Sequence, residues 1–278
     1  MKELKKITVT ITSPSGGCGV STMSKELCIW FSRLFGGDKK LRICYADMHS
    51  DSGAAVPLLG LSDCRYGLSD LVKDMRTWTS ESLNPDPESM LLDTMTWRNL
   101  EKYISYDRIR EVYVLPSAKE KPSPATNSTE ARLILESLSK NFDLLIADTP
   151  TVTPLAPITA GCMESSDKIL FLVRNDADGI ESMLRMRKDL IDAGLSDKIS
   201  ESAKMALLMT PAKDSYMSVR EVEEYLGFPV LCKIPYYPPA WTFNNSFSQI
   251  AHKGSPVEPA VRSIAGWISP ELNMNTRR

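Results

Sequence analysis

The sequence predicts a single-domain α/β protein in which helices cover both faces of a mostly parallel β-sheet. Three observations predict this fold class. Segments with strand and helix patterns alternate along most of the 278 residues, which is typical of βαβ units. A glycine-rich segment joins a strand pattern to a helix pattern near the N-terminus. Continuous apolar runs that end in aspartate are typical of parallel strands buried on both faces.

The first predicted strand and helix enclose the most informative segment of the chain. Residues Lys6–Ile11 alternate polar and apolar side chains, as in a strand, and Met23–Leu34 has apolar residues at helical spacing. Between them, residues 12–22 read TSPSGGCGVST. The three glycines allow backbone N–H groups to point toward an anion, and Ser21 supplies a hydroxyl at the start of the helix. The segment therefore predicts a phosphate-binding loop.

This loop departs from the usual phosphate-binding motif at two positions. A P-loop reads G-x-x-x-x-G-K-[ST], but here Pro14 occupies the place of the first glycine and Val20 that of the lysine. The loop thus keeps backbone and hydroxyl donors and lacks the motif's positive charge. Two interpretations stay open: the loop binds a nucleotide, or it only turns a strand into a helix.

Two further strand patterns each end in an aspartate. Leu41–Ala46 precedes Asp47, and the apolar run that begins at Phe142 ends in Asp148, as in a Walker B strand. Ligands of α/β proteins bind at the carboxyl ends of such strands. We therefore expect a Mg²⁺ site formed by Ser21, Asp47 and Asp148. His49 is either a metal ligand beside Asp47 and Asp51 or a loop residue without chemistry.

The rest of the chain continues the alternation. We expect short helical pieces at 58–61 and 68–72, a helical insertion at about 77–110, and a flexible tail at 273–278, so that the domain spans residues 1–272. The remaining predicted strands are 111–115, 168–173, 205–209 and 229–234, and the remaining predicted helices are 128–140, 180–193, 219–226 and 257–268. No chemistry is predicted for the insertion, which we interpret as a cap or a partner surface.

The order of these motifs resembles the deviant-Walker-A P-loop ATPases of the ParA/MinD group, and within it the pilus-assembly proteins of the CpaE/TadZ type. The family loop, x-Lys-Gly-Gly-x-Gly-Lys-[Ser/Thr], is similar to the segment SGGCGVS at 15–21. The family's Asp-x-Asp-x-x-x-Gly is similar to DMHSDSG at 47–53, its Asp-x-Pro to DTP at 148–150, and its late Gly-x-Pro-Val and Ile-Pro-Tyr to 227–230 and 234–236. The resemblance covers nearly the whole chain.

The resemblance implies binding of ATP or ADP with Mg²⁺. The residues that it places at the nucleotide are Ser15, Gly16, Gly17, Cys18, Gly19, Val20, Ser21, Thr22, Pro235 and Tyr236. It also implies the catalytic candidates Asp47, His49 and Asp148, and a homodimer with protein partners in a pilus or secretion assembly. The near-neutral charge makes DNA an unlikely partner, and we expect any membrane to be reached only through other proteins. A thiol near a helix N-terminus can be reactive, which is one interpretation of Cys18; plain occupancy of the family's variable position is the simpler one.

The departures from the family pattern argue against rapid ATP hydrolysis. Ser15 and Val20 replace the family's two lysines, and His49 replaces the second aspartate. Loss of a cation that faces developing negative charge removes transition-state stabilisation, worth about 10³-fold or more in rate. We therefore expect a degenerate Walker A motif and a pseudo-ATPase scaffold. The alternative is an active ATPase switch for partitioning or positioning whose missing cations come from elsewhere, for example from Lys213 or Arg174.

Composition is that of an ordinary globular protein, with 42% hydrophobic and 24% charged residues. A net charge of −2 provides no field that would attract nucleic acid or anionic lipid. The sequence contains neither a membrane-length apolar run nor a signal-peptide core. We therefore expect a cytoplasmic protein whose six cysteines are buried free thiols.

Overall fold

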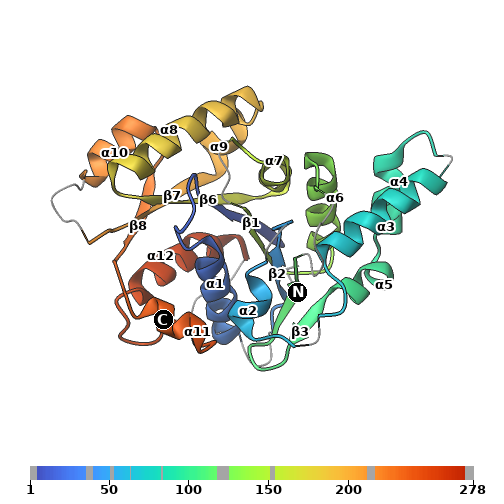
Figure 1. The fold of residues 1–278 in the computed structure, drawn as a ribbon, viewed down its shortest axis with the longest axis horizontal. Helices are drawn as coiled ribbons and strands as arrows, with labels where there is room; N and C mark the ends of the chain where they lie inside the picture. The colour runs from blue at the N-terminus through green and yellow to red at the C-terminus, as the bar shows by residue number, and fades with distance from the viewer. Residues whose placement is uncertain are drawn as a thin grey trace.

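The computed structural model describes residues 5–35, 40–50, 53–62, 64–82, 84–117, 125–150, 154–211 and 217–272. Within this part of the chain an eight-stranded sheet has the order β3-β4-β2-β5-β1-β6-β7-β8 (Figure 1). The strands are β1 (Ile7–Thr12), β2 (Ile43–Asp47), β3 (Ser105–Asp107), β4 (Val112–Leu115), β5 (Leu144–Asp148), β6 (Lys168–Arg174), β7 (Ala203–Leu208) and β8 (Val230–Ile234). All neighbouring strands pair in parallel except β3 and β4, which confirms the predicted α/β fold.

Helices cover both faces of this sheet. They are α1 (Val20–Leu34), α2 (Ala55–Leu59), α3 (Leu68–Glu81), α4 (Pro87–Thr94), α5 (Trp97–Leu100), α6 (Ser128–Ser139), α7 (Pro157–Ser165), α8 (Ala177–Asp192), α9 (Ser196–Ser202), α10 (Val219–Leu226), α11 (Ala240–Asn245) and α12 (Glu258–Ile268). Helices α1, α2 and α12 share one apolar core with the sheet. Helices α3 to α10 pack on the other face in two further clusters (Figure 1).

The central strand β1 is buried on both faces, although its sequence alternates polar and apolar residues. Its apolar residues face the core that contains α1. On the opposite face the Thr10 hydroxyl lies 2.6 Å from the hydroxyl of Ser166. Threonine is β-branched and suits a strand, so hydroxyl pairing satisfies polar groups in the interior. Alternation along β1 therefore does not indicate exposure to solvent.

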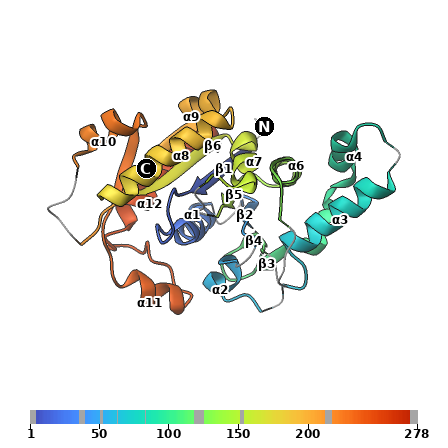
Figure 2. The same cartoon turned by 45° about the horizontal axis from the view of Figure 1, so that its top comes forward.

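The segment expected as a helical insertion differs from the expectation at both ends. Helix α3 begins at Leu68 and continues to Glu81, so it merges the short piece predicted at 68–72 with the start of the insertion. At the other end, β3 pairs antiparallel with β4 as an edge strand, which the sequence did not predict. Helices α3 and α4 extend from this side of the sheet (Figures 1 and 2).

The structure contains further elements that the sequence patterns did not predict. Helices α7, α9 and α11 are short, and each lies in a stretch that was left without an assignment. No helix of the described residues is long and apolar enough to cross a membrane. The expected tail at 273–278 lies outside the described residues.

Helices α6 and α7 cross so closely that we expect Gly161→Ala to destabilise the protein. A Cβ atom at Gly161 would lie 2.0 Å from the backbone oxygen of Ser128, and backbone cannot move aside as a flexible side chain can. Overpacking of this kind costs roughly 1–3 kcal/mol. The free energy of unfolding from urea titration measures the loss.

Gly266→Ala in α12 is the matched control, because a Cβ atom there meets nothing within 4 Å. Alanine in a helix interior is roughly 0.5–1 kcal/mol more favourable than glycine. Equal effects of the two substitutions would contradict the close-packing explanation.

Candidate functional site

The glycine loop follows the carboxyl end of β1 and leads directly into α1. Gly17 and Gly19 have φ angles of 76° and 78°, a left-handed conformation that glycine adopts without strain. Gly19 is the N-cap of α1, where no side chain caps the helix and the first turn holds no acidic residue. The free N–H groups of this turn and the positive end of the helix dipole form an environment that favours an anion.

Internal contacts give the loop a defined shape. The Ser13 hydroxyl donates to the carbonyl of Ser15 at 2.8 Å, and the Ser15 hydroxyl lies 3.4 Å from the Cys18 sulfur. Cys18 is 1% exposed and Val20 is 5% exposed, and both belong to the core beneath α1. The position of the motif lysine is therefore filled by a core residue, and the burial of Cys18 argues against a reactive surface thiol.

Helix α1 is joined to the α11 segment by a buried polar network that sequence reasoning missed. The Asn244 side-chain amide donates to the Thr22 hydroxyl at 2.9 Å, and its oxygen accepts from Lys25 Nζ at 2.8 Å. Lys25 also donates to the carbonyl of Ser248 and lies 3.3 Å from the Glu26 carboxylate. Burial lowers the pKa of Lys25, while Glu26 opposes that effect. The loop's last hydroxyl is thereby coupled to a segment more than 200 residues away in sequence.

Strand register places two carboxylates side by side. Asp47 and Asp148 are the last residues of β2 and β5, and they are direct partners across that parallel pair. Both are 0% exposed. Asp47 Oδ2 accepts the N–H of Ala55 at 2.8 Å, and Asp148 Oδ2 accepts the hydroxyl of Tyr45 at 2.7 Å. The other oxygen of Asp47, Oδ1, faces His49, whereas the other oxygen of Asp148, Oδ1, has no hydrogen-bond partner.

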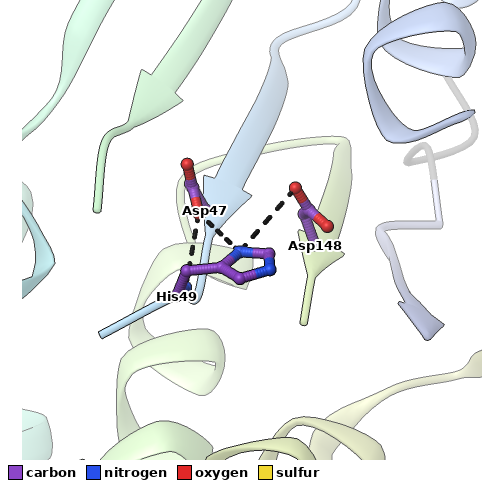
Figure 3. A group of neighbouring side chains, drawn as sticks. All are labelled: Asp47, His49 and Asp148. Carbon is purple, nitrogen blue, oxygen red and sulfur yellow. Dashed lines mark hydrogen bonds and ion pairs between the residues drawn. The ribbon is translucent and has the colours of Figure 1, made fainter. Parts of the chain in front are cut away.

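His49 lies between these carboxylates (Figure 3). Its Nδ1 is 2.8 Å from Asp47 Oδ1 and 3.9 Å from Asp148 Oδ2. Its side chain is 20% exposed, whereas the carboxylates are fully enclosed. The structure thus brings together the three residues predicted as catalytic candidates. Asp51, the other suggested neighbour of His49, lies outside the described residues.

Burial and mutual repulsion dominate the electrostatics of this cluster. Burial, and after it the charge of Asp47, raise the pKa of Asp148 to about 7, although His49 and the hydroxyls of Tyr45 and Ser21 act in the opposite direction. Burial lowers the pKa of His49, but the bond to Asp47 and the charges of both carboxylates outweigh it, so that the pKa rises above its usual value. The site therefore retains protons near neutral pH.

Unpaired polar atoms concentrate along the same edge of the sheet. Six buried side-chain atoms of the described residues have no hydrogen-bond partner, and five lie at or just beyond the carboxyl ends of the adjacent strands β5, β1, β6 and β7. They are Asp148 Oδ1, Thr12 Oγ1, Asn175 Oδ1, Thr210 Oγ1 and Arg174 Nε. The last of these makes no hydrogen bond but lies 3.4 Å from the Asp176 carboxylate. Because buried polar atoms are nearly always paired, we expect a polar ligand or ordered water to bind at this edge.

Other predicted site residues lie farther along that edge. Pro235 and Tyr236 follow β8, which is three strands from β1. At the usual strand spacing this is roughly 14 Å. Tyr236 is 56% exposed. Arg174, one suggested substitute cation, pairs with Asp176 and Asp178 at the start of α8, and Lys213 is outside the described residues.

Comparison with solved structures identifies the fold. MinD from Pyrococcus horikoshii, solved in complex with Mg-ADP, superposes with a TM-score of 0.68 at 16% identity, covering 95% of this chain and 96% of that one. MinD from Aquifex aeolicus gives 0.68 at 18% identity, with 95% and 97% covered. A ParA family ATPase from Chlorobium tepidum gives 0.67 at 16%, with 94% and 97% covered. The chain has the MinD/ParA fold.

No protein-family model matches the sequence, and no curated protein matches it. The likeness to MinD and ParA proteins is therefore a likeness of fold, at 16–18% sequence identity. In this fold the glycine loop, Asp47 and Asp148 occupy one edge of the sheet, as the sequence predicted.

We expect Asp148→Asn to flatten the pH dependence of stability. The folded-state pKa of Asp148 is raised to about 7, so the folded chain keeps a proton that the unfolded chain has already released above about pH 4. Stability contributed by this proton is complete below pH 4 and is lost as the pH rises toward 7. An isosteric amide still accepts from Tyr45 and carries no buried charge.

Urea unfolding at pH 5 and pH 8 with chelator present measures this effect. Between pH 5 and pH 8 the free energy of unfolding of the wild-type protein should fall by on the order of 2–4 kcal/mol more than that of the variant. Asp93→Asn on the exposed side of α4 is the control and should follow wild type. If the unfolding free energy of Asp148→Asn depends on pH as steeply as that of wild type, the buried carboxyl is not the cause of the pH dependence.

Proposed function

We propose that this chain is a ParA/MinD-type protein that binds ATP or ADP with Mg²⁺ at the glycine loop and hydrolyses it slowly or not at all. The observation that carries the proposal is the row of buried polar atoms without hydrogen bonds, those of Asp148, Thr12, Asn175 and Thr210, beside the uncapped start of α1. A ligand that spans several strands and ends in phosphate would meet both features. The MinD relative from P. horikoshii was solved with Mg-ADP, which supports this ligand class.

In this proposal the loop residues 15–22 surround the phosphates through backbone N–H groups and hydroxyls. Ser21, Asp47 and Asp148 would hold Mg²⁺, whose charge would neutralise phosphate oxygens and the two enclosed carboxylates. Pro235 and Tyr236 would meet the base at the far end of the edge. The orphaned oxygen of Asp148 supports this assignment, since it is buried and accepts no hydrogen bond.

Slow turnover follows from the positions of the positive charges. Val20 is packed in the core where a P-loop has its lysine. Lys25, the next lysine along α1, is fully buried and is engaged by Asn244, Ser248 and Glu26. Arg174 faces Asp176 and Asp178. None of these three described positions supplies a free cation for a developing phosphate charge.

A scaffold role would use this fold for protein contacts. We propose a homodimer that localises a pilus or secretion assembly, on the strength of the CpaE/TadZ-like order of motifs. Among the similar structures, one from A. aeolicus is a MinC:MinD complex, at 18% identity to this chain, which supports protein partners in general terms. The cytoplasm would be the site of action, with membranes reached through those partners.

We expect Mg-ATP to raise the melting temperature of the wild-type protein. Ligand that binds only the folded state stabilises it by mass action, and about tenfold excess over Kd shifts a protein of this size by about 3 °C. Ser15→Glu should abolish the shift, because it places a negative charge in the loop. Ser200→Glu adds the same charge at an exposed position of α9 and should keep the shift. No shift at millimolar Mg-ATP contradicts nucleotide binding.

Phosphate release separates the scaffold from an active switch. We expect no turnover above background from the purified protein, alone or with DNA or vesicles, because the loop lacks its cations. Turnover that Asp148→Ala abolishes would overturn the scaffold role and support an ATPase switch for partitioning or positioning. Release that is equal in both proteins would be contaminating activity.

A further inference from the structure

We propose that Asp47, His49 and Asp148 form a binding site for a divalent transition metal, such as Zn²⁺, Mn²⁺ or Co²⁺. The metal would bind there in the absence of nucleotide. This goes beyond nucleotide binding, because it assigns an imidazole ligand and a different class of metal to the enclosed carboxylates. Mg²⁺ prefers oxygen ligands and retains its water. Imidazole nitrogen suits first-row transition metals.

The spacing of the three side chains fits direct coordination. One ligand atom from each residue lies within 4.8 Å of the others, with 2.8 Å from Asp47 Oδ1 to His49 Nδ1 and 3.9 Å from His49 Nδ1 to Asp148 Oδ2. Metal–ligand bonds of about 2.0–2.2 Å in tetrahedral geometry place neighbouring ligand atoms roughly 3.3–3.6 Å apart. A metal ion would therefore need only small side-chain rotations to replace the direct contact between His49 and Asp47.

The carboxylates are oriented by groups behind them. The Ala55 N–H holds Asp47 Oδ2 and leaves Oδ1 toward His49. The Tyr45 hydroxyl holds Asp148 at Oδ2. Such outer partners fix the direction of metal ligands. Gly53 adds enclosure, since a Cβ atom there would lie 2.6 Å from Asp47 Oδ2.

The second oxygen of Asp148, other than the Oδ2 that lies nearest His49, is unpaired. Asp148 is 0% exposed, and its Oδ1 has no hydrogen-bond partner. A buried carboxylate oxygen without a donor is costly unless a cation or water meets it. Among the described residues, His49 is the ion-pair partner recorded for both aspartates, and a divalent ion would balance two enclosed negative charges more fully.

The site retains one open side. His49 is 20% exposed whereas both aspartates are enclosed. A metal held by three protein ligands keeps further positions for water or for another oxygen ligand. The ion would therefore be exchangeable and would not be locked in during folding.

Metal titration without nucleotide tests the proposal. Chelator-treated protein is titrated with Zn²⁺, Mn²⁺ and Mg²⁺ by calorimetry, and with Co²⁺ by visible absorption. We expect Zn²⁺ and Co²⁺ to bind at least tenfold more tightly than Mg²⁺, and His49→Gln to weaken them tenfold or more and remove the Co²⁺ spectrum. His252→Gln, at the only other histidine of the chain, is the matched control and should bind as wild type.

A second measurement uses the wild-type protein alone. Mn²⁺ should broaden the imidazole NMR signals of His49 and leave those of His252 sharp, so the test holds even if a variant does not fold. Equal affinity of wild type and His49→Gln for Zn²⁺, affinity no greater than for Mg²⁺, or equal broadening of both histidines would overturn the proposal. Since nucleotide is absent throughout, these results are independent of the Mg-ATP shift.

Discussion

The in-register pairing of β2 with β5 is the constraint on which the site depends. It sets Asp47 directly beside Asp148 at the carboxyl edge, with both side chains fully enclosed. Two buried like charges repel strongly in a medium of low polarisability. Three neighbouring groups partly offset this repulsion, namely the Tyr45 hydroxyl, the Ala55 N–H and the His49 imidazole. The folded chain therefore requires protons or a cation at this point.

The glycine loop and the two carboxylates lie at the same edge of the sheet. Strand β1 lies beside β5 in the sheet, so the loop that follows Thr12 leaves from the same edge as Asp148. The buried polar atoms without hydrogen bonds continue this edge toward β7. The polar network of Lys25 and Asn244 joins α1 to the α11 segment. A ligand at the loop would thus contact groups from strands and a helix whose positions are all set by the central core.

Sequence reasoning recovered what local pattern and strand ends determine. Buried apolar runs that end in Asp47 and Asp148 predict parallel strands with carboxylates at one edge, and parallel topology then makes them neighbours. It could not recover β3, because a three-residue edge strand is defined by its partner. Nor could it find that Asn244 satisfies Lys25, since that contact joins residues 219 apart. The sequence signal for this network was the presence of Lys25 and Glu26 among the apolar residues of α1.

The departures from the ParA/MinD loop pattern change the local charge at three positions. The pattern has two lysines and a second aspartate, and this chain has Ser15, Val20 and His49 at those positions. Loss of two positive charges and one negative charge would leave the edge more negative by one unit, but a protonated His49 adds that unit back. Local charge is then conserved while its location moves from the phosphates to the space between Asp47 and Asp148. Such a shift would keep the carboxylates of the edge balanced and would leave the loop without a cation that faces phosphate, which is the physical basis of the proposed slow turnover.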